Sequence, residues 1–63
     1  MEYKYILKTD LGTFLTTKGD ILSDNINDIR TFDNIGDAFR ESARFKEEYG
    51  ITLIVERMYI IPL

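Results

Sequence analysis

The sequence predicts an α+β fold in which a small antiparallel sheet of three to four strands is covered on one face by one helix. Three observations support this prediction. Residues 2–9 alternate between apolar and polar and lead through a glycine turn into a second strand-like stretch at 13–17. Residues 35–49 have helical periodicity, and strand formers follow Gly50. The expected order is ββ(β)αβ, in a single mini-domain spanning residues 1–63.

Length and composition limit how such a fold is stabilised. The chain has 63 residues and contains neither cysteine nor histidine. A chain of this length lies near the lower limit for burying enough apolar surface to fold alone. Because no disulfide or structural zinc site can supplement the core, we expect stability to depend on efficient apolar packing or on self-association.

The charge balance disfavours some classes of partner. Eleven acidic residues stand against eight basic ones, a net charge of −3, whereas nucleic-acid modules usually carry a basic face. No apolar run approaches the roughly 20 residues of a membrane span, and the N-terminal stretch MEYKYILK lacks a signal-peptide core. We therefore expect a cytoplasmic protein that binds no membrane, with nucleic acid as a disfavoured partner.

The first element is a predicted β-hairpin at 2–17. Alternation places two sets of side chains on opposite faces of the first strand: Tyr3, Tyr5 and Leu7 on one, and Glu2, Lys4, Ile6 and Lys8 on the other. Gly12 supplies a residue that accepts positive φ in the turn. The TFLTT stretch at 13–17 is rich in β-branched and aromatic residues, as returning strands are.

The middle of the chain gives weaker signals. KGD at 18–20 is typical of a turn or bulge, and IL at 21–22 could extend the second strand. Loop-forming residues follow at 23–28, and IRTF at 29–32 predicts a short third strand that leads into the helix.

The helix is predicted over 35–49. Asn34 is the favoured N-cap because Asp37 then falls at the third helical position, and Asp33 is the competing cap. Gly50 is the expected left-handed C-cap. The apolar stripe consists of Ile35, Ala38, Phe39, Ser42, Phe45 and Tyr49, and we expect the two phenylalanines to fill the space beside the small residues.

The opposite helix face is charged. It presents Asp37, Arg40, Glu41, Arg44, Glu47 and Glu48, spaced to form i,i+3 and i,i+4 ion pairs. Such faces are usually solvated, so the helix is predicted to act mainly as a lid on the core. These six residues are also the candidate surface for a protein partner.

The C-terminal stretch ITLIVERMYIIPL predicts a strand from about residue 51. One side carries Leu53, Val55, Tyr59 and Ile61, and the other carries Ile54, Met58 and Ile60. A strand that is apolar on both faces has more to bury than one helix can cover. Either its far end folds back on the core, or Met58, Tyr59, Ile60 and Ile61 form a homodimer interface. Pairing should stop at or before Pro62.

The residue inventory argues against catalysis. Without histidine or cysteine there is no imidazole base and no thiolate nucleophile, so we expect no catalytic residue, cofactor site or metal site. Asp20, Asp24 and Asp28 do not match a calcium-binding loop, which needs a glycine at its sixth position. Tyr3 and Tyr5 lie on the strand side opposite Lys4 and Lys8, which favours core packing over base stacking.

Two stretches carry a resemblance. The hairpin KYILKTDLGTFLT and the helix-to-strand stretch TFDNIGDAFRESARFKEEYGITLIVE resemble small uncharacterised proteins of bacteriophages and prophages of Gram-positive bacteria. The resemblance implies a non-enzymatic accessory protein that binds a host or defence protein. Two alternatives stay open: an acidic inhibitor that occupies a nucleic-acid-binding cleft of a host enzyme, and a small nucleic-acid-binding regulator that uses Lys4, Lys8 and the hairpin.

Overall fold

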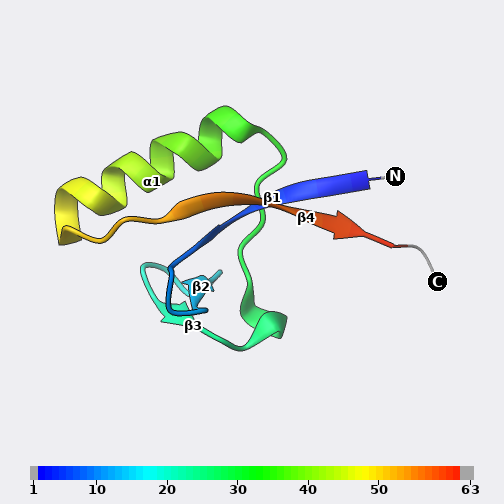
Figure 1. The fold of residues 1–63 in the computed structure, drawn as a ribbon, viewed down its shortest axis with the longest axis horizontal. Helices are drawn as coiled ribbons and strands as arrows, with labels where there is room; N and C mark the ends of the chain where they lie inside the picture. Colours follow the sequence, from blue (N-terminus) through cyan, green and yellow to red (C-terminus); the bar gives the residue numbers. More distant parts are fainter. Residues whose placement is uncertain (1, 62–63) are drawn as a thin grey trace.

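A computed structural model describes residues 2–61 and confirms the predicted fold class. One helix packs on a four-stranded antiparallel sheet in the order β3-β2-β1-β4 (Figure 1). The elements are β1 (Glu2–Lys8), β2 (Phe14–Leu15), β3 (Leu22–Ser23), the 3₁₀ turn η1 (Ile26–Asp28), α1 (Ile35–Tyr49) and β4 (Ile54–Ile60).

The longest ladder joins the first and last strands. β1 and β4 pair without interruption from Glu2 opposite Ile60 to Lys8 opposite Ile54. The final strand begins about three residues later than predicted, since residues 51–53 form no ladder. Instead, the Ser42 hydroxyl donates a hydrogen bond to the Leu53 carbonyl at 2.8 Å, which ties this connection to the helix.

The predicted hairpin is present, with a shorter second strand. Lys8 pairs with Phe14, and the Thr9 N–H donates to the Thr13 carbonyl at 2.8 Å across the turn. Gly12 has φ +88°, a conformation that is strained for residues with a side chain, so the glycine is required where the chain reverses.

The middle of the chain differs from the prediction in two respects. Residues 21–22 do not extend β2, because Gly19 (φ +89°) turns the chain back and Leu22 pairs with Leu15 in β3. The third strand predicted at 29–32 takes the form of two isolated antiparallel bridges, Thr16 to Ile29 and Tyr5 to Phe32.

The helix has the predicted bounds and caps. The Asn34 side chain accepts a hydrogen bond from the Gly36 N–H at 2.7 Å, and Gly50 ends the helix with φ +71°. This cap satisfies one of the backbone donors that a helix start leaves free.

The buried core is small and lies between α1 and the sheet. It consists of Leu7, Leu15, Phe32, Ala38, Phe45 and Leu53, with Tyr5, Leu22 and Val55 packed against it. The expectation that Phe39 fills this core is wrong, because 56% of its surface is exposed. Ala38 and Phe45, seven positions apart, face the sheet, and Phe39 lies about 100° round the helix from Ala38.

Candidate functional site

One candidate surface lies where β1 and β4 run past the helix toward the chain termini (Figure 1). We call this part the ribbon, defined as Glu2–Tyr5 paired with Arg57–Ile60. Apolar side chains are exposed here on both faces, including Tyr3, Tyr59 and Ile60.

The ribbon face on the helix side carries a tyrosine patch. Tyr3 packs edge-on against Tyr5 at a centroid distance of 5.6 Å and lies 5.8 Å from Tyr59. The Arg57 guanidinium lies 4.8 Å from the centre of the Tyr3 ring, a cation–π geometry. Hydrogen bonding to Tyr59 and the neighbouring tyrosines raise the pKa of Arg57. This face therefore combines aromatic rings with a positive charge.

Two expectations about these aromatic residues change. Tyr5 packs against the core as predicted, but Tyr3 is 41% exposed and belongs to the surface. The predicted separation of aromatic and basic side chains holds for Lys4 and Lys8 only. Arg57 joins the aromatic face because it pairs directly with Tyr5 in the ladder, a contact that alternation along β1 alone does not reveal.

The four residues predicted to mediate self-association lie on both faces of β4. Tyr59 is on the helix side, Met58 and Ile60 are on the face without a helix, and the exposed Ile61 directly follows the strand. The lysines of that second face are paired, Lys4 with Asp33 at 2.7 Å and Lys8 with Glu56 at 2.8 Å. The strand ends at Ile60, which confirms the prediction that pairing stops at or before Pro62.

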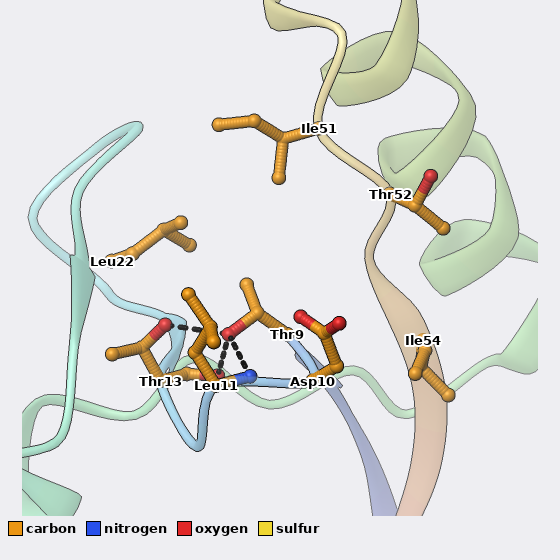
Figure 2. Close-up of a pocket in the computed structure, with 8 residues that line it drawn as sticks. All are labelled: Thr9, Asp10, Leu11, Thr13, Leu22, Ile51, Thr52 and Ile54. Atoms are coloured by element: carbon orange, nitrogen blue, oxygen red, sulfur yellow. Dashed lines mark hydrogen bonds between the residues drawn. The ribbon is translucent and has the colours of Figure 1, made fainter.

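A second candidate surface is an apolar groove at the other end of β1. It has a volume of about 460 Å³ and lies between the β1–β2 turn, β3 and the connection from α1 to β4. Figure 2 shows Leu11, Leu22 and Ile51 reaching toward one space from these three segments. Leu11 is 86% exposed in the turn, so most of its side chain is free to contact another molecule.

Polar groups on the turn shape the groove floor. The Thr9 and Thr13 hydroxyls share a hydrogen bond of 2.7 Å, and the Thr9 hydroxyl accepts one from the Leu11 N–H at 3.3 Å. Asp10 lines the same groove and forms no ion pair within residues 2–61. The groove therefore offers apolar walls beside an available negative charge.

Sequence reasoning did not identify this groove. The DLG stretch was interpreted as turn chemistry alone, although Leu11 has no strand role that would explain an apolar residue there. The approach of Ile51 from the far end of the helix depends on tertiary packing and leaves no local signal. The local signal for this surface is the position of a leucine between two turn-forming residues, Asp10 and Gly12.

The charged helix face contains a network centred on Arg44. Its guanidinium donates to Asp20 at 2.6 Å, to Glu41 at 2.5 Å and to Glu48 at 2.9 Å. These three carboxylates raise the pKa of Arg44. The Tyr49 hydroxyl also donates to Asp20 at 2.5 Å, so the β2–β3 turn is fastened to the helix.

This network engages most of the helix residues predicted as a partner surface. Glu41 also accepts from Arg30 at 3.3 Å, and Asp37 pairs with Arg40. The i,i+3 and i,i+4 pairs expected between acidic and basic residues are therefore largely formed, although Glu47 forms none in the described part of the chain. A shallow polar groove of about 380 Å³ lies between these side chains and Phe32.

No group of metal-ligating side chains assembles within residues 2–61. Of the three aspartates weighed as a cation site, Asp20 binds Arg44 and Asp28 pairs with Lys18 at 3.4 Å. No helix in this range is long and apolar enough to cross a membrane.

Comparison with protein-family models, curated proteins and solved structures finds no match for this chain. The resemblance to phage proteins therefore stays a prediction.

Proposed function

We propose that this protein works without catalysis, by binding another protein through the apolar groove between the β1–β2 turn and the helix C-terminus. The observation that carries the proposal is the exposed Leu11 beside Leu22, Ile51 and Asp10. Protein interfaces gain most of their affinity from a few apolar anchors held in desolvated pockets. The resemblance to phage accessory proteins would make the target a host or defence protein.

The groove favours a particular kind of target segment. Its walls suit one aliphatic or aromatic side chain, and Asp10 suits a lysine or arginine beside that anchor. The net charge of −3 attracts the same basic segment over a longer range. A segment with an apolar anchor next to a basic residue is the chemistry that both features recognise.

Selection of peptides from a random displayed library tests this proposal. Immobilised wild-type protein should enrich peptides that carry an apolar residue next to lysine or arginine. Leu11→Asp should lose this enrichment, because a charge then occupies the groove. Ile26→Asp is the matched control, since Ile26 is also exposed but lies on η1, outside the groove lining. Equal enrichment on Leu11→Asp and wild type would refute the groove as the binding site.

One observation favours a second candidate, the nucleic-acid-binding regulator. The tyrosine patch presents Tyr3 and Tyr59 next to Arg57, the combination on which single-stranded bases stack. Against it stands the net negative charge of the chain. Titration of a fluorescent single-stranded oligonucleotide at low salt separates the candidates: binding that Arg57→Gln removes and Leu11→Asp leaves unchanged supports the regulator.

The acidic-inhibitor alternative has less support. Three of the four helix carboxylates that would imitate phosphates, namely Asp37, Glu41 and Glu48, are paired with Arg40 or Arg44. Paired carboxylates present little net negative field to a basic cleft.

A further inference from the structure

The outer edge of β4 is an open hydrogen-bonding edge. The Tyr5 N–H and carbonyl both bond to Phe32, on the side of β1 away from β4. Alternation along an antiparallel ladder then directs the backbone groups of Lys4 and Ile6 toward β4, where they face Met58 and Glu56. The backbone N–H and carbonyl groups of the intervening β4 residues point away from β1. The residues whose backbone groups face the open edge are therefore Val55, Arg57 and Tyr59.

The features that usually protect an edge strand are weak here. Edge strands are commonly interrupted by bulges or prolines, or carry charges that repel a second strand. β4 runs through seven residues in regular register with no proline. Its two charged side chains are occupied within the chain, Glu56 by Lys8 and Arg57 by the Tyr3 ring. The flanking side chains at this edge are largely apolar and exposed.

We propose that β4 pairs antiparallel with β4 of a second copy, about a two-fold axis at Met58. In a two-fold antiparallel pair, the residue on the axis lies opposite itself. An axis at Glu56 or Arg57 would place like charges directly opposite each other, which is destabilising.

An axis at Met58 avoids this conflict and gives complementary pairs. Arg57 then lies opposite the partner's Tyr59, and Val55 lies opposite the partner's Ile61. The pairing of Arg57 with a further tyrosine extends the cation–π contact that Arg57 already makes with Tyr3. An axis at Tyr59 would also separate the charges, but it would leave Val55 beyond the paired segment. The strand is therefore most self-complementary about Met58, which argues for a second copy as its partner.

The position of the helix is compatible with this pairing. α1 lies beside the first half of β4, which follows the helix in the chain. The ribbon half of β4 extends beyond α1 (Figure 1). Antiparallel pairing about Met58 places the two uncovered ribbon halves beside each other and the two helices at opposite ends. The tyrosine patches of both copies then form one surface on the helix side of a continuous sheet. This interface is separate from the groove, so it does not rest on the proposed target binding.

Single-cysteine crosslinking tests both the dimer and its register, because the natural chain has no cysteine. At a non-hydrogen-bonded pair on the axis, the two Cα atoms are about 4.5 Å apart, which lies within the range of about 4.4–6.8 Å that a disulfide spans. Met58→Cys should therefore form a disulfide-linked dimer under mild oxidation. Glu56→Cys and Ile60→Cys are matched controls on the same strand face. Each would lie about 13 Å along the strand from its own copy and should stay unlinked.

Sedimentation equilibrium completes the test. At high micromolar concentration, wild-type protein and Leu11→Asp should both sediment at twice the chain mass of 7.4 kDa. Met58→Asp should sediment at the mass of one chain, because two carboxylates would then meet on the axis. A wild-type monomer at that concentration would overturn the proposal. Equal crosslinking of all three cysteine variants would overturn the register.

Discussion

β1 and β4 pass through two different environments along one uninterrupted ladder. In the half under the helix, Leu7 pairs with Val55, and Leu7 is fully buried with Ala38 and Phe45 in the core. In the ribbon half, Tyr3 pairs with Tyr59 on the same face of the same strands, and both side chains are about half exposed. The sheet is continuous, but the helix covers only one half of it (Figure 1).

This difference shows that alternation and burial are separate properties of a strand. Alternation decides which side chains share a face, and it holds in both halves. Burial depends on whether another layer lies over that face. With a single helix of 15 residues, the chain covers one half, so the ribbon keeps apolar surface available for contact with other molecules.

The largest expected effect on stability comes from removing the helix side chain that fills the core. Phe45→Ala should cost about 3–5 kcal/mol of unfolding free energy, because the ring is buried and its loss leaves a cavity. Few domains of this size have that much stability to lose, so the variant should be largely unfolded by circular dichroism.

Phe39→Ala is the matched control on the same helix. Because more than half of Phe39 is exposed, its removal should change the melting temperature little. If Phe39→Ala unfolds the protein while Phe45→Ala does not, the helix is rotated relative to the packing described here.

The sequence predicted the fold class, the hairpin, the helix and both helix caps, since each depends on nearby residues. Asn34 and Gly50 act within one helical turn, so a local pattern identifies them. The position of Phe39 was missed because a stripe that runs from Ile35 to Tyr49 is wider than the contact with the sheet. Packing, rather than periodicity, selects the part of the stripe that is buried.

The candidate site was much less predictable. The separate strand β3 depends on the reversal at Gly19, and a lone glycine does not distinguish a turn from a bulge. The groove joins Leu11 to Ile51, which are 40 positions apart in the sequence. The ion pair between Asp20 and Arg44 is another contact between residues distant in the sequence. It attaches the β2–β3 turn to the charged helix face, which is therefore not a free surface at this point.

A smaller effect compares the two halves directly. Leu7→Ala in the covered half should cost about 2–5 kcal/mol, whereas Tyr3→Ala in the ribbon should cost about 0.5–1.5 kcal/mol for its aromatic contacts. Both residues lie on one face of β1, so the helix that covers Leu7 and leaves Tyr3 exposed is the main expected source of the difference. Urea unfolding at low micromolar concentration, where self-association contributes least, measures both values. Equal costs would show that the ribbon is as well packed as the core.

The smallest effect concerns the contacts of Asp20 that attach the β2–β3 turn to the helix. Asp20 accepts hydrogen bonds from Arg44 and Tyr49, which lower the pKa of its carboxyl below the ordinary value of 3.8. The same contact with Asp20 raises the pKa of the Tyr49 hydroxyl above 10.0. Because these groups lie at the surface, their effect on stability should be modest and should weaken with added salt.

The two shifts determine the sign of the pH dependence. A carboxyl whose pKa is lowered by folding stabilises the fold above its unfolded value, and this contribution is lost as pH falls below 3.8 through the folded pKa. A hydroxyl whose pKa is raised stabilises the fold below 10.0, and this contribution is lost as pH rises through its folded pKa. Asp20→Asn should therefore be less stable than wild type between these limits, and the gap should narrow beyond either one. Asp24→Asn is the control for loss of a charge in the same region, because Asp24 forms no ion pair within residues 2–61. Thermal unfolding of the three proteins across this pH range measures the gap, and a gap that persists unchanged at pH 2 would contradict the role given to Asp20.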